Sequence, residues 1–211
     1  MAPVTTTRAD QVAARRAELL DAAQRVVLER GLANTRVADV AQATNVSGGL
    51  IHYHFATKDI LLTEMMRTAA EADISRARRI ATGKGSALER LDKLLRNWIP
   101  AAGEDENWLL WIDAWGAGLR EPAVAGISAE LDAAWVAVLQ SILRDGQASG
   151  EFSGADPADI AVRIGALLDG LGVRYTLGRN MSRRQLLEHA RTAAALELGI
   201  DRSAFDGLSG R

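Results

Sequence analysis

Helical periodicity is the feature that most constrains the fold of this 211-residue chain. Apolar residues recur three and four positions apart along most of its length, as they do on the buried face of an amphipathic helix. We find no segment with the strict apolar–polar alternation between turn residues that is typical of a strand. The sequence therefore predicts an all-α protein with about nine helices.

Start and stop signals separate these helices. Thr57 is placed to cap a long helix, Asp156-Pro157 combines a cap with a proline in the first turn, and Ser86 and Ser182 each open a capping box. Gly31 is a natural helix end, and Pro100 ends another. We expect helices near residues 8–30, 35–43, 47–53, 58–81, 86–100, 106–120, 122–148, 157–178 and 182–199, followed by a frayed tail.

Composition narrows the class of protein. The chain is 48% hydrophobic and 25% charged, which is ordinary for a globular protein. It lacks cysteine, an uninterrupted run of eighteen apolar residues and a signal-peptide pattern, so we expect a cytoplasmic protein with no membrane span. Residues 1–100 carry 15 Lys and Arg against 11 Asp and Glu, whereas residues 101–211 carry 10 against 16. This asymmetry indicates that only the first half meets a polyanion.

Residues 34–59 read NTRVADVAQATNVSGGLIHYHFATKD and carry the strongest functional signal. Two short helices are joined by a tight turn in which Asn45 tolerates a left-handed conformation. Ser47 is placed to cap the second helix, and Gly48 and Gly49 leave bare backbone in its first turn. This is the pattern of a helix-turn-helix, whose second helix enters the major groove of DNA by its N-terminal end.

The residues that follow suit contacts with phosphate. Tyr and His side chains donate hydrogen bonds to phosphate oxygens, and Lys58 lies at the start of the next helix, where free N–H groups also attract anions. Phe55 is expected to pack inward against the first helix. His52 and His54 point to different sides of a helix, which argues against a shared metal ion. For Tyr53, simple packing is the alternative to a phosphate contact.

This segment resembles the TetR family of transcriptional regulators. The family pattern has a Val-Ser-x-Gly stretch, a Tyr/His-rich end, Phe, and a Lys that opens the next helix; here these are Val46–Gly49, His52–Phe55 and Thr57–Asp59. The string GLIHYHF is similar to the branch that includes choline-responsive regulators of the betaine pathway. The detailed motif covers about residues 15–66, and it departs from the pattern at Asn45, Leu50 and His52.

The resemblance implies a role for each matching residue. Thr35 and Arg36 would meet the DNA backbone, and Tyr53, His54 and Lys58 would hold phosphates. The residues expected to face the groove are Ser47, Gly48, Gly49, Leu50 and His52, with Leu50 suited to a thymine methyl group.

The resemblance also implies the organisation of the whole chain. We expect a helix-turn-helix domain at residues 8–57, a ligand-binding and dimerisation domain at 58–200, and a tail at 201–211. The helices near 157–178 and 182–199 would form the homodimer interface. A small-molecule effector would release the repressor from a palindromic operator on double-stranded DNA; activation in place of repression is the alternative.

Tryptophans mark the candidate effector site. Trp108, Trp111 and Trp115 share one helical face, and a cage of such rings attracts a quaternary ammonium or polyamine. Asp113 lies off that face. Ordinary core packing is the alternative for each aromatic residue, and an apolar effector is the alternative ligand. The full candidate set is Trp98, Trp108, Trp111, Trp115, Met65, Met66 and Tyr175.

Two other classes of protein fit the sequence less well than a transcriptional regulator. An enzyme is disfavoured because the sequence has no HExxH, no GxxxxGK[ST], no Glu-x-x-His pair and no convincing Ser/His/Asp order, so we assign neither catalytic residues nor a cofactor or metal. A helical protein-interaction module is the third reading. Salt-dependent affinity for a palindromic duplex separates these possibilities.

Overall fold

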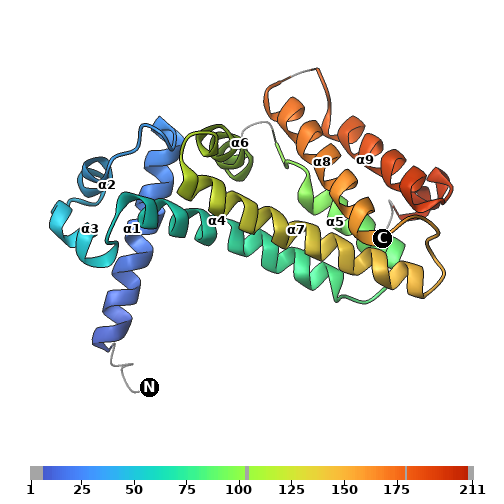
Figure 1. Cartoon of the computed structure of the whole chain (residues 1–211), viewed down its shortest axis with the longest axis horizontal. Helices are drawn as coiled ribbons and strands as arrows, with labels where there is room; N and C mark the ends of the chain where they lie inside the picture. Colours follow the sequence, from blue (N-terminus) through green and yellow to red (C-terminus); the bar gives the residue numbers. More distant parts are fainter. Residues whose placement is uncertain (1–6, 103–104, 179, 209–211) are drawn as a thin grey trace. The chain divides into compact units, whose positions relative to one another are not determined.

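The computed structural model describes residues 7–102, 105–178 and 180–208, and within them it is helical with no strand. The helices follow the order expected from the sequence (Figure 1). Their bounds are α1 Arg8–Arg30, α2 Val37–Thr44, α3 Gly48–His54, α4 Lys58–Ala81, α5 Ala87–Trp98, α6 Glu106–Gly118, α7 Pro122–Ala148, α8 Pro157–Thr176, α9 Arg183–Leu198 and the 3₁₀ helix η1 Arg202–Leu208. The all-α prediction and its nine α-helices are confirmed for the described residues.

The predicted capping signals form the helix starts. The Ser86 hydroxyl accepts a hydrogen bond from the Glu89 amide, and the Glu89 carboxylate accepts one from the Ser86 amide. Ser182 and Gln185 repeat this arrangement at α9. The Asp156 carboxylate caps α8, whose first residue is Pro157. Each cap satisfies amides that a helix start leaves without an intrahelical partner, which is why these positions could be predicted locally.

The chain divides into two compact units, and each has its own buried residues. Unit 1 comprises Met1–Ala70 and Leu110–Ser128, and unit 2 comprises Glu71–Leu109 and Ala129–Arg211. The division therefore falls inside α4, α6 and α7. The domain boundaries expected at residues 57 and 200 remain predictions, because compactness alone does not assign a function to either side.

Unit 1 contains the three helices that precede α4. α2 lies against both α1 and α3 (Figure 1). Buried apolar side chains from each of the three helices fill the space between them: Leu19, Ala22, Ala23, Val26, Val40, Ala41 and Ile51. The arrangement leaves the outer faces of α2 and α3 free of core residues.

In unit 2, α8 and α9 run side by side, and α9 also contacts α5 and η1 (Figure 1). A buried ion pair joins α5 to α9, with Arg191 Nε donating to the Asp92 carboxylate at 2.8 Å. The Asp92 carboxylate also accepts a hydrogen bond from Arg96 at 2.8 Å. The same buried region receives the aromatic ring of η1.

The end of the chain corrects one prediction. The expected frayed tail instead folds into η1, and Phe205 at its centre is fully buried. The guanidinium groups of Arg191 and Arg202 both lie 5.8 Å from the centre of the Phe205 ring. The buried Phe205 ring and the ion pair of Arg202 with Glu188 thus hold this short polar segment against α5 and α9.

α7 is the one described helix that is long and apolar enough to cross a membrane, with a mean hydropathy of 1.4. Its residues Leu139, Ile142 and Leu143 are completely buried inside the protein. Three acidic residues, Glu130, Asp132 and Asp145, interrupt its apolar sequence. These features are those of a core helix.

Candidate DNA interface and effector site

The turn between α2 and α3 has the geometry that the sequence predicts. Asn45 ends α2 in the left-handed conformation, with φ 53° and ψ 44°. The Ser47 hydroxyl then accepts a hydrogen bond from the Leu50 amide at 3.3 Å and caps α3. Ile51, on the opposite side of α3, is completely buried and fixes the helix to unit 1.

The two glycines at the start of α3 have no internal packing role. Among the described residues, a Cβ added to Gly48 would meet nothing within 4 Å, and one added to Gly49 would lie 3.8 Å from the Ser47 hydroxyl. Neither residue has a positive φ. Glycine weakens a helix, so two glycines that neither packing nor backbone conformation requires suggest that something outside the chain approaches this backbone closely.

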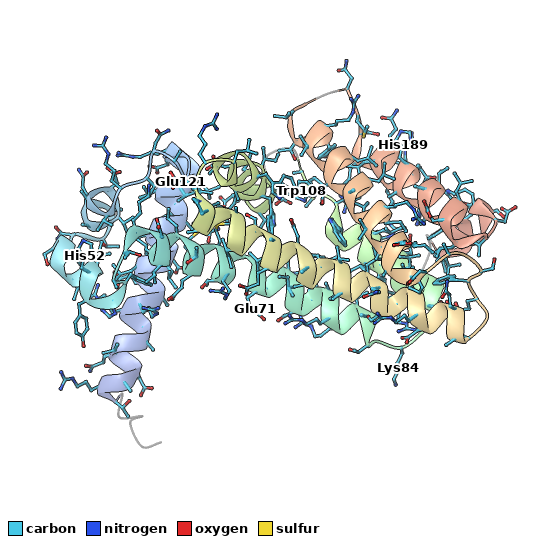
Figure 2. All side chains as sticks on the ribbon, viewed as in Figure 1. His52, Glu71, Lys84, Trp108, Glu121 and His189 are labelled. Carbon is cyan, nitrogen blue, oxygen red and sulfur yellow. The ribbon has the colours of Figure 1, made fainter. Side chains whose placement is uncertain are left out.

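The C-terminal end of α3 carries exposed polar and aromatic side chains. Tyr53 is 71% exposed, so the packing alternative for this residue is not supported. His52, labelled on α3 in Figure 2, is also exposed, whereas His54 is half-buried. The rings of Tyr53 and His54 meet edge to face at 5.2 Å. The three side chains therefore follow one another along the end of a helix whose start is bare.

Phe55 packs inward, as expected. It is 1% exposed, and the Arg16 guanidinium from α1 lies 4.2 Å from its ring centre. Arg16 also donates hydrogen bonds to the His54 carbonyl and to the Glu64 carboxylate of α4. One side chain of α1 thus fixes the end of α3 and the beginning of α4, which carries Lys58.

The predicted contacts at the start of α2 are only partly accessible. Thr35 is 1% exposed, and its hydroxyl donates to the Gly31 carbonyl at 2.8 Å. This differs from the expected backbone contact, because the side chain is used to close the turn after α1. Arg36 is exposed. Lys58 is half-buried at the start of α4, where the Thr57 hydroxyl caps the Ile60 amide at 3.2 Å.

In unit 2, tryptophans from α5, α6 and α7 gather beside α8. The Trp98 indole donates to the Asp169 carboxylate at 3.1 Å, and the Trp108 indole donates to the Trp98 carbonyl at 3.2 Å. The ring centres of Trp98 and Trp135 are 4.9 Å apart. Gly172 of α8 is required here, because a Cβ would lie 2.0 Å from the Trp108 ring, which Figure 2 labels.

Two carboxylates accompany these rings. Burial raises the pKa of Asp169 to about 6; the Trp98 indole N–H opposes this shift, and the nearby negative charge of Asp132 adds to it. Burial also raises the pKa of Asp132 above its usual range. Among the described ion pairs, none includes either residue. The cluster therefore combines aromatic faces with negative charge that has no basic partner in the described part of the chain.

The predicted effector residues are divided between the two units. Trp98, Trp108 and Tyr175 belong to unit 2, whereas Met65, Met66, Trp111 and Trp115 belong to unit 1. Met65 and Met66 are buried core residues, and the Trp111 and Trp115 rings lie 6.1 Å apart. Sequence reasoning missed Trp135, Asp132 and Asp169. The available signal was the presence of acidic residues inside two apolar helices, Asp132 in α7 and Asp169 in α8.

Two family models match the chain. The model described as bacterial regulatory proteins, tetR family, matches residues 19–65, and the model described as BetI-type transcriptional repressor, C-terminal, matches residues 87–199.

Among the described residues, no group of three His, Asp or Glu side chains could hold a metal ion.

Similar proteins agree with these models. The HTH-type transcriptional regulator BetI of Burkholderia thailandensis is 30% identical over 174 residues, which cover 77% of this chain and 82% of that protein. The repressor KstR2 of Mycobacterium tuberculosis is 37% identical over 86 residues, and that match spans only 43% of its length.

Solved structures give the same picture. A transcriptional regulator from Saccharomonospora viridis in complex with choline is 28% identical, with a TM-score of 0.75, and the match covers 85% of this chain and 95% of that one. A TetR-family regulator from Rhodococcus is 31% identical, with the same TM-score, and the match covers 88% and 99%.

Proposed function

Because this chain belongs to the TetR family of transcriptional regulators, we propose that it is a repressor that binds a palindromic operator as a homodimer and is released by a small-molecule effector. Two recognition helices of a dimer reach successive major grooves only when they are about 34–36 Å apart. An effector that changes this spacing disfavours DNA, and DNA disfavours the effector by the same factor. Such a regulator acts in the cytoplasm.

The single observation that carries the DNA-binding proposal is the bare start of α3. Gly48 and Gly49 leave space where a side chain would point, and at Gly48 no described residue fills that space. Tyr53, His54 and Lys58 follow in positions suited to phosphate. Leu50 is the side chain at this end best suited to read a base, through the methyl group of thymine.

Duplexes selected by the wild-type protein from a random pool test this proposal. We expect Lys58→Ala to weaken all duplexes about equally and to reduce the salt dependence of binding, because it removes a phosphate contact. Leu50→Ala should instead change the sequence preference. Lys84→Ala is the matched control, since Lys84 is exposed in the loop between α4 and α5. Binding of every duplex by both variants at wild-type affinity would show that the groove assignment is wrong.

We further propose that the effector is an organic cation bound beside Trp98 and Trp135. Aromatic faces and a carboxylate are the groups that bind a quaternary ammonium in proteins. Asp169 and Asp132 supply negative charge at this place, and the Saccharomonospora viridis regulator was crystallised with choline. An apolar effector is the competing class, because it would gain from the rings but not from the carboxylates.

Calorimetric titration of the intact protein separates these classes. We expect choline, betaine or a polyamine to bind, and Asp169→Asn to weaken that binding at least about tenfold, because the variant lacks the charge. Asp159→Asn is the control on the same helix, since Asp159 is exposed in the first turn of α8. Binding of neutral or anionic apolar compounds alone would keep the repressor proposal and reject the cation site.

A further inference from the structure

Asp113 of α6 makes a contact that neither DNA binding nor effector binding explains. Its carboxylate accepts a hydrogen bond from the backbone amide of Leu32, which lies in the turn between α1 and α2. Both residues belong to unit 1. Leu32 is 1% exposed, so its amide is poorly placed to find water as a substitute partner. A charged acceptor on an apolar helix is therefore used to hold a buried backbone group of the helix-turn-helix region.

The turn is shaped to meet this carboxylate. Gly31 ends α1 with φ +81°, a conformation that L side chains rarely adopt. A Cβ at Gly31 would lie 3.5 Å from one Asp113 oxygen and 3.6 Å from the other, so the carboxylate packs directly over this residue. Asp113 thus contacts two consecutive residues of the turn, one through a hydrogen bond and one through packing.

Further hydrogen bonds connect this turn to the start of α2. The Thr35 amide and hydroxyl both donate to the Gly31 carbonyl, at 3.1 and 2.8 Å. The Asp39 carboxylate accepts hydrogen bonds from the Arg36 amide at 3.0 Å and from the Arg30 guanidinium at 2.7 Å. Thr35 therefore connects the residue before the cap of α2 to Gly31, and the ion pair of Arg30 with Asp39 connects the end of α1 to α2.

We propose that Asp113 is a positioning residue for DNA binding, whose carboxylate fixes the turn between α1 and α2 and thereby orients α2 and α3 toward the duplex. The inference rests on the proposed function. In this proposal a side chain of α6 makes a direct hydrogen bond to the helix-turn-helix region. Without that hydrogen bond, α2 and α3 sample more orientations before binding, and the entropy lost when DNA orders them lowers the affinity.

Two substitutions separate the hydrogen bond from the charge. Asp113→Ala removes the acceptor, whereas Asp113→Asn keeps an oxygen that can accept from the Leu32 amide. Glu121→Ala is the matched control, because Glu121 is an exposed carboxylate at the junction between α6 and α7 in the same unit. The probe is a duplex that the wild-type protein selects from a random pool, measured well below the thermal midpoint of each variant.

We expect Asp113→Ala to bind this duplex at least about fivefold more weakly, and Asp113→Asn and Glu121→Ala to stay within about twofold of wild type. Hydrogen exchange gives a readout that does not depend on DNA: the Leu32 amide should exchange slowly in the wild type and in Asp113→Asn, and faster in Asp113→Ala.

Equal DNA affinity in Asp113→Ala and wild type would overturn the inference, as would equal losses in the alanine and asparagine variants. Rapid exchange of the Leu32 amide in the wild type would also overturn it, even if Asp113→Ala failed to fold. If the wild-type protein selected no duplex at all, the proposed function itself would fail, which is a different result from these.

Discussion

Asp169 illustrates how one side chain combines stability and recognition. Burial raises its pKa to about 6, from an ordinary value of 3.8, so the folded protein holds this proton more tightly than the unfolded chain does. The favourable contribution of the protonated group is complete below about pH 4 and is lost as the pH rises through 6. At neutral pH the ionised carboxylate is therefore a cost to folding that a bound cation would offset.

We expect Asp169→Asn to be more stable than wild type by about 1–3 kcal/mol at pH 8 and nearly equal to it at pH 4. The amide oxygen can still accept from the Trp98 indole, so the substitution removes mainly the charge. Urea unfolding at the two pH values measures the difference. If the gain at pH 8 were absent, or the same at pH 4, ionisation of Asp169 would not be its source.

At Gly49, helix stability and DNA binding are expected to favour different residues. The backbone at Gly49 leaves room for a methyl group, and alanine favours a helix over glycine by up to about 1 kcal/mol. We expect Gly49→Ala to keep or slightly raise the thermal midpoint while lowering affinity for a selected duplex by about tenfold, because the methyl group would enter the DNA contact. Unchanged affinity in an equally stable variant would remove Gly49 from the interface.

Residues of the candidate sites differed in how well the sequence could place them. The glycines at the start of α3 and the inward Phe55 follow from local pattern and spacing, and both agree with the structure. For Tyr53 the sequence left packing open as an alternative, which its exposure of 71% does not support. Thr35 could not be placed in this way, because its burial depends on the turn folding back to Gly31. Asp132 and Asp169 were missed because their environment is made by helices distant in sequence.

At the scale of elements, helix starts were the most predictable part of the fold. A capping box is a local exchange of two hydrogen bonds, so Ser86 and Ser182 could be read directly from the sequence. The tail could not, because η1 has only 7 residues and is too short to show a helical period. Its structure depends on the space that α5 and α9 leave for Phe205, which is a property of the packed helices.

Phe205 should therefore contribute strongly to the stability of unit 2. We expect Phe205→Ala to lower the free energy of unfolding by about 3–5 kcal/mol, the usual cost of removing a fully buried phenylalanine. Leu119→Ala is a control, because Leu119 is 81% exposed and should change stability by about 0.5 kcal/mol or less. Denaturant unfolding of both variants measures these free energies. Equal stability of the two variants would mean that η1 does not pack against α5 and α9 in solution.

At the scale of the whole molecule, family membership confirms the resemblance drawn from residues 34–59. This chain is a transcriptional regulator and not an enzyme, and the BetI-type match agrees with the branch suggested by its recognition segment. The more basic first half contains α3, and the acidic second half contains the Asp132 and Asp169 pair. The charge asymmetry is thus consistent with a polyanion and an organic cation as the two proposed partners.

The proposed homodimer would use α8 and α9, which leave two large apolar side chains exposed. Val162 on α8 is 57% exposed, and Leu196 on α9 is 79% exposed. We expect the double variant Val162→Glu with Leu196→Glu to be a monomer by light scattering and to lose high-affinity binding to a palindromic duplex, because charges oppose burial at an interface. Leu119→Glu is the control outside these helices. A double variant that stayed dimeric would place the interface elsewhere.

Unit 1 consists of two separate stretches of the sequence, and this limits how the regulator can be re-engineered. Its helix-turn-helix region shares a compact unit with Leu110–Ser128, and the amide of Leu32 is paired by a residue of that later segment. A fragment that ended at Ala70 would contain every proposed DNA contact but would leave that amide without its partner. Chimeric regulators that exchange sensory modules by a single junction after the helix-turn-helix would meet the same problem, whereas grafts that carry residues 110–128 with the DNA-binding half would avoid it.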